Sequence, residues 1–391
     1  MKIVIATTLL YDAKSPFNHL FKDIILEYLK AGHEVVRIVA CVDKKSDDYK
    51  MDIISGKIKY IPVIRKKSVK SNIISRYILD TITAIRMSKI IRDIDADILF
   101  EDTLYTSYWT TRTAKRKKMR VIAMLQDVWP DNAVQSNLIK EDSLIYRYFD
   151  AWQRAVYKLS DKIICISDDM KRFIIQKGVP ESKISVIYNW GYSDEKVDIS
   201  WEDNEFVKKY NLSKHTFYAV YAGNIGRMQN VELILRTAKL LEYDNHIRFL
   251  IVGEGVQKSK IEQMALNMKL INVDFIPFQP SSLATAIYSA AGVNLVTLVK
   301  GGIRTALPSK TGIILSCGNS AVFAFGSDSC FAGVLENHKV FCCINETDEK
   351  ALAEKIVLLS KETMTNKDYS VFENYFMKSK NVQLYVEALN E

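Results

Sequence analysis

The sequence has few of the residues that build metal sites. Its 391 residues include only five histidines, and the six cysteines contain no C-x-x-C pair. Metal centres need such side chains clustered at short spacings, so we expect none here. Several cysteines lie in apolar, strand-like runs, where a free thiol serves as a small core side chain in a reducing compartment. The cysteines are Cys41, Cys165, Cys317, Cys330, Cys342 and Cys343.

Long hydrophobic runs are also missing. No apolar stretch approaches the roughly 18 to 20 residues that a membrane-spanning helix needs. The N-terminal run Met1–Leu10 carries one positive charge, but no small-residue cleavage site follows it, and Asp12 and Lys14 interrupt the pattern. This run therefore fits a first strand better than a signal peptide. We expect a cytoplasmic protein that is not integral to a membrane.

The formal net charge of +8 is unevenly distributed. Residues 57–76 contain no carboxylate, and residues 115–120 form a second basic run. Each run is either a solvated face or a surface attracted to an anionic lipid leaflet, where each cation contributes about 1 kcal/mol. Nucleic acid is a weaker expectation, because aromatic side chains are not interleaved with these runs. The cations of the first run are Lys57, Lys59, Arg65, Lys66, Lys67, Lys70 and Arg76.

Short apolar runs alternate with helix-like segments along the chain. The length exceeds the roughly 250 to 300 residues at which a single core stops growing, so two domains are expected. The alternation predicts an α/β fold of doubly wound parallel sheets. It fails between Tyr188 and Thr216, which divides the chain into residues 1–193 and 194–391. A last helical segment, about 368–391, is placed to pack back on the first domain.

The stretch Tyr221–Glu232 is the most informative single segment. A buried strand before it and a helix from about Asn230 enclose the sequence Gly223-Asn224-Ile225-Gly226-Arg227. A glycine turn between a strand and a helix directs backbone N–H groups and the helix dipole to one point, where Arg227 adds a full charge. Such a point suits a phosphate, although a Gly-x-x-Gly sequence between a strand and a helix is often only a tight turn.

Four segments in the same order resemble the retaining glycosyltransferases of family 4, in the branch that builds bacterial O-antigen and capsular polysaccharide. That family has the GT-B fold, in which two Rossmann-like domains face each other. The segments span most of residues 120–345. They are Asp127-Val128-Trp129-Pro130-Asp131; Ser160–Ser167 with Lys177–Pro180 and Lys183–Trp190; Tyr221–Gln229 with Ile251–Gly255; and Leu307-Pro308-Ser309-Lys310 with Gly318.

The resemblance implies a nucleotide-sugar donor, usually a UDP-sugar, on the C-terminal domain and an acceptor on the N-terminal one. No cofactor and no metal are implied if Arg227, Lys310 and helix N-termini offset the diphosphate charge, which is electrostatic stabilisation of the leaving group. Phe278 and Gln279 match the loop that reads the base, although Phe278 also suits plain core packing. The residues implied for donor binding are Gly223, Asn224, Gly226, Arg227, Gly253, Gly255, Phe278, Gln279, Arg304, Ser309 and Lys310.

Asp127 is the candidate in the N-terminal half. It follows a strand end, and Gln126 stands where many relatives have a histidine near the transferred sugar. A carboxylate there can orient the acceptor or steady positive charge on the sugar. Asp127 can also simply cap the next helix. With Arg227 and Lys310, it completes the catalytic set that the resemblance implies.

The sequence departs from the family pattern at two places. Most relatives have two glutamates where this chain has Thr305 and Ile313, and neither side chain can accept a sugar hydroxyl as a carboxylate would. Arg304 nearby either contacts phosphate or lies on the surface. The N-terminal loop lacks the paired glycines of the family, although Lys14 and Asn18 are placed to line the site.

These observations lead to one main functional interpretation. The chain is expected to transfer a sugar from a UDP-sugar to a lipid-linked saccharide during surface polysaccharide synthesis, peripherally at the inner face of the plasma membrane. Residues 57–76 and 115–120 would contact anionic lipid. A non-catalytic GT-B partner subunit is the first alternative, because of Thr305 and Ile313. A sugar-nucleotide epimerase is weaker, since no histidine falls in a matched segment.

Overall fold

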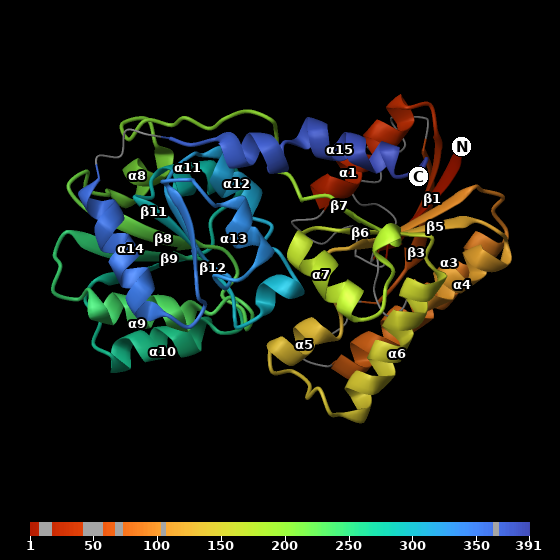
Figure 1. The fold of residues 1–391 in the computed structure, drawn as a ribbon, viewed down its shortest axis with the longest axis horizontal. Helices are drawn as coiled ribbons and strands as arrows, with labels where there is room; N and C mark the ends of the chain where they lie inside the picture. Colours follow the sequence, from red (N-terminus) through yellow and green to blue (C-terminus); the bar gives the residue numbers. More distant parts are fainter. Residues whose placement is uncertain (8–17, 42–57, 67–72, 103–106, 363–366) are drawn as a thin grey trace. The chain divides into compact units, whose positions relative to one another are not determined.

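A computed structural model describes residues 1–7, 18–41, 58–66, 73–102, 107–362 and 367–391. The chain divides into two compact units. Unit 1 comprises residues 1–131, 139–188 and 380–391, and unit 2 comprises 132–138 and 189–379. Each unit carries one parallel sheet with helices on its two faces (Figure 1).

The described part of unit 1 contains a seven-stranded sheet in which every neighbouring pair is parallel. Its central strands are almost fully buried, which explains their continuous apolar sequences. In order across the sheet the strands are β3 (Ile58–Ile64), β2 (Glu34–Cys41), β1 (Lys2–Thr7), β4 (Ile98–Asp102), β5 (Arg120–Leu125), β6 (Lys162–Cys165) and β7 (Ile184–Val186).

Alternate residues of the unit 1 strands face different helices. Leu99 packs in a core with Met87 and Ile91 of α3 and Ala114 of α4. The next residue, Phe100, lies on the other face of the sheet, against aromatic rings from α1 and α15. The helices are α1 (Asn18–Lys30), α3 (Ile73–Arg92), α4 (Tyr108–Arg116), α6 (Leu144–Leu159), α7 (Asp168–Gln176) and α15 (Lys378–Glu387), most of which belongs to unit 1.

The last twelve residues close the core of unit 1. Tyr385 is 1% exposed, and its ring centroid lies 5.9 Å from that of Phe100. Arg120 donates hydrogen bonds to the carbonyls of Leu389 and Ala388, at 2.5 and 3.3 Å. The C-terminal segment is therefore a structural part of the N-terminal sheet's core. The segment 368–389, which reads as one helical stretch in the sequence, contains a π-helix at Phe372–Phe376 before α15.

The described part of unit 2 contains a six-stranded parallel sheet. Helices α9, α10 and α14 cover one face, and α8, α11 and α12 lie together on the other (Figure 1). The strands, in order across the sheet, are β10 (Val273–Ile276), β9 (Ile247–Val252), β8 (Phe217–Ala222), β11 (Val293–Thr297), β12 (Ala321–Ala324) and β13 (Phe341–Ile344). The helices are α5 (Asp131–Gln135), α8 (Glu205–Tyr210), α9 (Val231–Leu240), α10 (Lys258–Asn267), α11 (Ala284–Ser289), α12 (Thr311–Ser316), α13 (Cys330–Val334) and α14 (Glu349–Lys361).

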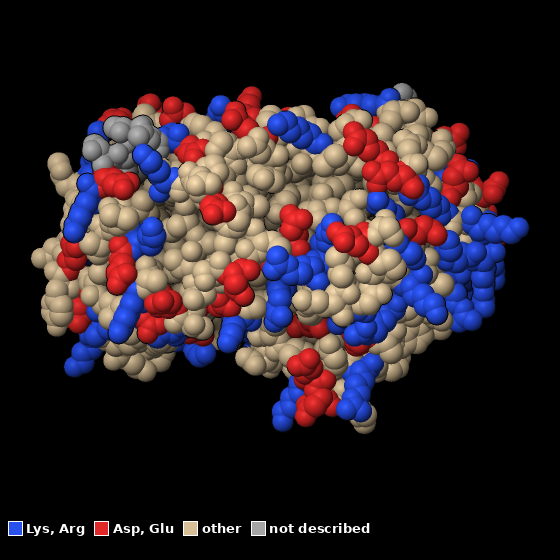
Figure 2. Space-filling view, in the orientation of Figure 1, with Lys and Arg blue, Asp and Glu red and all other residues tan. Residues whose placement is uncertain are grey.

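Figure 2 shows many lysine and arginine side chains gathered on the surface of unit 1. Not all cations of the two basic runs are free for a partner, however. Arg65 is 8% exposed and forms an ion pair of 2.6 Å with Asp80. Lys115 pairs with Asp161 at 2.8 Å, and Lys117 donates to the carbonyl of Arg92 at 2.9 Å.

Some cations of the two runs therefore serve inside the protein, and the membrane contact predicted for the runs stays a prediction. Arg65 is a core ion pair, and Arg120 holds the C-terminal segment. Arg116 and Lys118 are exposed. Lys57, Lys67, Lys70 and the side chain of Arg76 lie outside the described residues.

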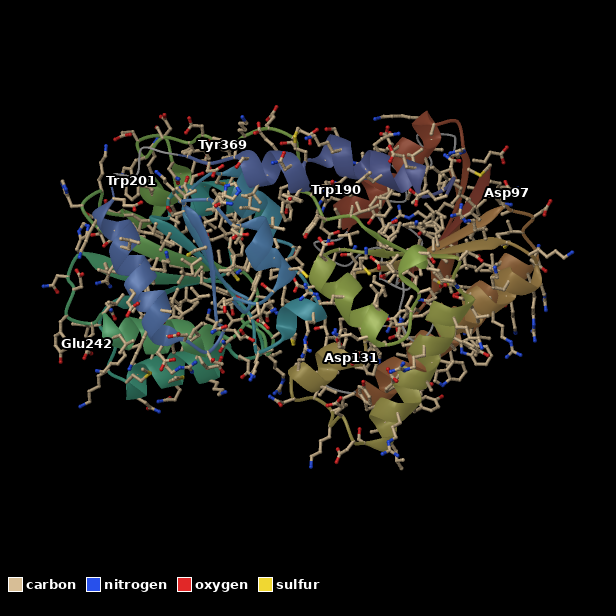
Figure 3. The ribbon with its side chains drawn as sticks, viewed as in Figure 1. Asp97, Asp131, Trp190, Trp201, Glu242 and Tyr369 are labelled. Carbon is tan, nitrogen blue, oxygen red and sulfur yellow. The ribbon has the colours of Figure 1, made fainter. Side chains whose placement is uncertain are left out.

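Two further observations concern the chain as a whole. In the part of the chain that the structure describes, no helix has both the length and the apolar character needed to cross a membrane. Asp97 accepts a hydrogen bond of 2.7 Å from the backbone N–H of Lys2 and so joins the amino ends of β1 and β4 (Figure 3). The opposite, carboxyl edge of each sheet is where ligands bind in folds of this kind.

Tyr385→Ala is expected to destabilise unit 1 by about 3 to 5 kcal/mol, because truncating a buried aromatic side chain leaves a cavity. Leu384→Ala is the matched control, since Leu384 precedes it on α15 and is 38% exposed. Its cost should stay below about 1 kcal/mol. Chemical denaturation of the two variants measures the difference. Equal losses would show that the C-terminal segment does not complete this core.

Candidate active site

The strand order reverses in unit 2 between β8 and β11. These strands are neighbours in the sheet, but β9 and β10 intervene in the sequence. The connections that follow β8 and β11 therefore leave in opposite directions and open a crevice at the carboxyl edge. The glycine stretch found in the sequence, residues 223–226, follows β8 directly. The loop 298–305, which contains Gly301 and Thr305, follows β11.

Two glycine loops interlock at this edge. The N–H of Gly223 donates to the Val252 carbonyl at 2.9 Å, and the N–H of Ile225 donates to the Glu254 carbonyl at 2.8 Å. A Cβ atom on Gly253 would lie 1.9 Å from the Gly223 oxygen, and one on Gly255 would lie 2.2 Å from the Ile225 oxygen. Only glycine permits this close approach of two backbones. The paired glycines of the two motifs thus fix the turn after β8.

Lys310 reaches the same turn. Its Nζ lies 3.7 Å from the centroid of the Tyr221 ring and donates a hydrogen bond of 3.0 Å to the Ala222 carbonyl. A Cβ atom on Gly223 would lie 3.5 Å from this ammonium group. No described carboxylate forms an ion pair with it. Burial lowers the pKa of Lys310 to about 7, so the ammonium group is held where its charge has little compensation.

Two side chains of the turn reach solvent, whereas Ile225 is fully buried. Asn224 and Arg227 both have exposed side chains, and the hydroxyl of Tyr221 donates to the Asn224 carbonyl at 2.6 Å. Helix α9 begins at Val231, close to the predicted start, with Asn230 before it in a left-handed conformation. The Asn230 amide donates to the Leu298 and Glu346 carbonyls, at 3.2 and 2.7 Å. The turn therefore exposes the Arg227 guanidinium, and the hydrogen bonds of Asn230 fix its C-terminal end.

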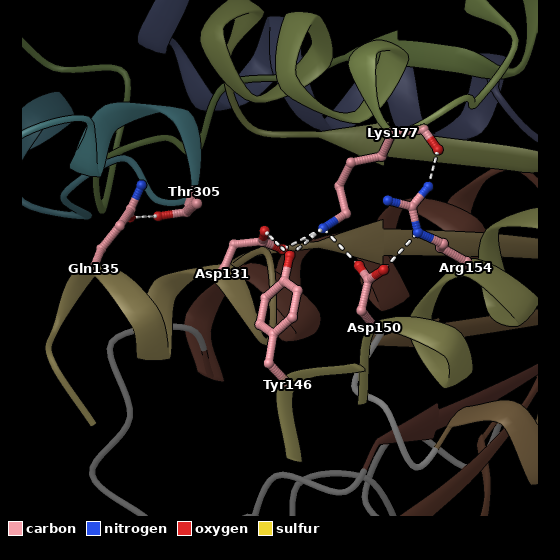
Figure 4. Close-up of polar contacts among 7 residues, drawn as sticks. All are labelled: Asp131, Gln135, Tyr146, Asp150, Arg154, Lys177 and Thr305. Carbon is pink, nitrogen blue, oxygen red and sulfur yellow. Dashed lines mark hydrogen bonds and ion pairs between the residues drawn. The ribbon is translucent and has the colours of Figure 1, made fainter. Parts of the chain in front are cut away.

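The loop after β11 is held by side chains that the sequence did not single out. Glu346, 9% exposed, accepts a hydrogen bond of 2.9 Å from the N–H of Gly301. The amide of Gln135 donates to the Gly301 carbonyl at 2.8 Å, and its oxygen accepts from the hydroxyl of Thr305 (Figure 4). Thr305 is fully buried. The position where relatives have a glutamate thus serves here to fix the loop.

The other predicted donor-binding residues differ in exposure. Phe278 is 64% exposed, which rules out the alternative that it packs in the core. Gln279 is buried, and its side chain accepts from Lys209 Nζ and donates to the Pro277 carbonyl, both at 2.8 Å. Arg304 is exposed, and Ser309 is partly exposed.

The segment 127–131 is fixed in unit 1 by a buried lysine. Lys177 Nζ forms ion pairs with Asp131 at 2.6 Å and Asp150 at 2.7 Å (Figure 4). The hydroxyl of Tyr146 donates to the Asp131 carboxylate at 2.9 Å, and Arg154 pairs with Asp150 at 2.6 Å. Two sequence motifs, Asp127–Asp131 and Lys177–Pro180, are therefore joined by this network, which positions the segment that carries Asp127.

Asp127 itself is partly exposed and does not cap a helix, because α5 begins four residues later, at Asp131. Two more carboxylates end the neighbouring strand β4. Glu101 is 1% exposed and accepts hydrogen bonds from the hydroxyls of Thr110 and Thr111. Asp102 is 6% exposed. Three acidic side chains therefore lie at the carboxyl edge of the unit 1 sheet.

Burial controls the ionisation of these carboxyl groups. It raises the pKa of Glu101 to about 8, although the two threonine hydroxyls act in the opposite direction. It raises the pKa of Asp127 to about 6. The pKa of Asp102 rises to about 7, first through burial and then through the nearby charge of Asp127. Near neutral pH these groups can hold protons that a solvated carboxyl group would have lost.

Sequence reasoning missed Glu101, Asp102, Glu346 and Gln135. A signal existed for Glu101 and Asp102, because two acidic residues directly follow the apolar run 98–100. Glu346 and Gln135 stand in segments with no periodic pattern. Lys14 and the side chain of Asn18 lie outside the described residues. Among the residues that are described, no group of three or more histidine, cysteine, aspartate or glutamate side chains can hold a metal ion.

Gly255→Ala is expected to destabilise unit 2 by about 1 to 3 kcal/mol, because the added methyl group collides with the Ile225 backbone. Gly333→Ala is the matched control. Nothing lies within 4 Å of a Cβ atom at Gly333, which is part of α13, so alanine there should be neutral or stabilising. Chemical denaturation compares the two. An unchanged stability of Gly255→Ala would contradict the interlocked loops.

Both halves of the chain match known glycosyltransferase families. The family described as Glycosyltransferase Family 4 matches residues 19–190, and Glycosyl transferases group 1 matches residues 202–378. The probable glycosyltransferase WbjE of Pseudomonas aeruginosa is 25% identical over 55% of this chain and 51% of its own length. The putative colanic acid biosynthesis glycosyl transferase WcaI of Escherichia coli K12 is 25% identical over 68% of this chain and 67% of its own. The chain thus spans about half to two thirds of these two relatives.

Solved structures share the fold over the whole chain. Anabaena HepE in complex with UDP has a TM-score of 0.74 at 13% identity, covering 100% of both chains. Sucrose-phosphate synthase of Thermosynechococcus elongatus has a TM-score of 0.75 at 13% identity, covering 100% of this chain and 99% of the other. The predicted GT-B architecture of two Rossmann-like parallel sheets is confirmed. The chain belongs to the family 4 glycosyltransferases with the GT-B fold.

Proposed function

We propose that this protein is a retaining glycosyltransferase that moves a sugar from a UDP-sugar to a lipid-linked saccharide in the synthesis of a surface polysaccharide. Retention is the chemistry of the family. The name of WbjE supports glycosyl transfer, and the name of WcaI, a putative colanic acid biosynthesis glycosyl transferase, supports a role in polysaccharide synthesis. Anabaena HepE binds UDP and UDP-glucose, which supports a uridine nucleotide as the donor's leaving group.

One observation carries the donor proposal: the turn after β8 has cations and no described carboxylate partner for them. Lys310 lies over the Tyr221 ring, and Arg227 is exposed on the same turn. A departing diphosphate develops negative charge that fixed cations and backbone N–H groups stabilise without reorganisation. Lys310 would approach the phosphates from the protein side and Arg227 from the solvent side. This arrangement offsets the leaving-group charge with side chains of the protein.

The acceptor side of the proposal rests on unit 1. Asp127 stands at the carboxyl edge of the unit 1 sheet, where hydroxyl groups of a saccharide can donate to it. A lipid-linked saccharide would further require that unit 1 meets a membrane surface. Helix α6 exposes Leu144 at 80%, Ile145 at 55% and Tyr148 at 47%. The hydroxyls of Tyr148 and Tyr77 lie 2.8 Å apart, so α3, which exposes Ile78 at 50%, is next to α6.

We define these exposed side chains of α3 and α6 as the apolar surface of unit 1. Arg86 and Lys89 of α3 and Arg147 of α6 are exposed on the same two helices, and Arg112 is exposed on α4. Apolar and aromatic side chains with flanking cations are the composition of a surface that rests on an anionic bilayer. The proposed membrane contact therefore comprises these cations and the exposed members of the two basic runs, but not Arg65, Lys115 or Arg120, which have internal partners.

A second candidate is a non-catalytic partner subunit of a true transferase. It is favoured by Thr305, which is fully buried and engaged by Gln135, so it does not offer a carboxylate to a donor sugar. Such a subunit would not release UDP from any donor. The same assay therefore separates the two candidates.

The test is release of UDP when the purified protein and a bacterial membrane lipid extract are given UDP-glucose, UDP-galactose or UDP-N-acetylglucosamine. We expect release with at least one donor. Lys310→Met should lower the rate by roughly a hundredfold or more, as loss of one hydrogen-bond donor to developing negative charge does in other active sites. Lys339→Met, an exposed lysine just before β13 at the other edge of the sheet, should keep the rate. No release across these and GDP- and TDP-sugars would count against the transferase.

Membrane contact is tested by sedimentation with lipid vesicles. The protein should sediment with vesicles rich in phosphatidylglycerol and stay in solution with phosphatidylcholine alone. The double variant Leu144→Ser and Ile145→Ser should lose this binding, whereas Val256→Ser should keep it, because Val256 is 79% exposed but lies in unit 2. Binding that is unchanged by the double variant would remove α6 from the proposed surface.

A further inference from the structure

The sheet of unit 1 also has a switch point. Strands β1 and β4 are neighbours in it, although β2 and β3 lie between them in the sequence. Asp102 is the last residue of β4 and pairs in register with Met124 of β5. Asp127 follows the end of β5 by two residues. Two carboxylates from adjacent strands therefore stand at the carboxyl edge, beside the point where ligands bind in such sheets.

The Asp102 side chain is buried without a hydrogen-bond donor. It is 6% exposed, and no described residue donates to its carboxylate. Its neighbour Glu101, equally buried, accepts from two threonine hydroxyls. Asp127 likewise receives no donor from the described residues. Buried polar groups in folded proteins nearly always have partners, so the buried Asp102 carboxylate points to a partner from outside the chain, next to the partly exposed Asp127.

The charges of the two groups indicate the kind of partner. Burial and the charge of Asp127 raise the pKa of Asp102 to about 7, and burial raises the pKa of Asp127 to about 6. Around neutral pH the pair therefore holds a variable number of protons, with one group acting as donor and the other as acceptor. A sugar hydroxyl donates and accepts hydrogen bonds at the same atom, which fits such a pair. A metal ion fits less well, since no group of three or more acidic, histidine or cysteine ligands occurs among the described residues.

We propose that Asp102 and Asp127 together form a binding site for a hydroxyl group of the acceptor saccharide. This inference rests on the proposed transfer to a saccharide and adds Asp102 to it. Asp127 is more exposed and contacts the hydroxyl from the solvent side, while Asp102 contacts it from the sheet. The pair thus selects an acceptor that presents a hydroxyl group at this edge.

The experiment follows the two carboxyl groups directly by NMR of protein labelled with ¹³C at aspartate Cγ. Spectra of Asp102→Asn and Asp127→Asn assign the two resonances. Methyl glycosides of glucose, galactose and N-acetylglucosamine serve as probes, each added to the wild type and to Asp102→Asn. Asp95→Asn is the control, because Asp95 is exposed and precedes the opposite, amino end of β4. UDP is titrated into the same samples, and binding of UDP reports on unit 2 alone.

At least one glycoside should shift both resonances in the wild type and in Asp95→Asn, and should lose its effect in Asp102→Asn. The titration of Asp102 should also move to lower pH in Asp127→Asn, because the neighbouring negative charge of Asp127 has been removed. Glycosides that leave both resonances unmoved while UDP binds would overturn this inference and leave the transferase proposal standing. Absence of UDP binding would instead count against the transferase. Shifts caused by Mg²⁺ and by no glycoside would replace the hydroxyl site with a cation site.

Discussion

The contact on which the site of unit 2 depends is the one between the ammonium group of Lys310 and the ring of Tyr221. Lys310 Nζ lies 3.7 Å from the ring centroid and has no described carboxylate partner. The ring attracts the cation, but a partly buried ammonium group with one carbonyl as its hydrogen-bond partner is incompletely solvated. This loss of solvation disfavours the charged form and lowers the pKa of Lys310. An incoming anion would supply the missing charge, which is why we regard the group as poised for a diphosphate.

The interlocked glycines make that contact possible. The Gly253 and Gly255 loop fixes the Gly223 turn through backbone contacts that no side chain permits. Within this turn the Tyr221 hydroxyl donates a hydrogen bond to the Asn224 carbonyl. The switch point of unit 1 carries the opposite charge, because Asp102 and Asp127 lie near it. Cations at one switch point and carboxylates at the other suit a diphosphate and a polyhydroxylated acceptor, respectively.

The regular part of this fold could be predicted from the sequence, since buried parallel strands appear as short apolar runs. The helix predicted from about Asn230 is α9, which begins at Val231. Some features had no sequence signal. Residues 132–138 belong to unit 2. The sequence could not predict this, because α5 has only five residues, too few for a periodic pattern. Thr305 looked like a lost functional residue, and only the structure shows that its hydroxyl fixes a loop through Gln135. The burial of Arg65 within a basic run depends on Asp80, fifteen residues away, and so could not be seen locally.

The central claim is that Lys310 receives the diphosphate, and proton uptake tests it most directly. Calorimetry of UDP binding at pH 8, in buffers of different ionisation enthalpy, counts the protons exchanged. Lys310, whose pKa is about 7 in the free protein, is mostly neutral at that pH and should become charged beside the anion. The account predicts uptake of about one proton for each UDP bound, and none for Lys310→Met. Tight binding of UDP with no proton uptake by the wild type would contradict it.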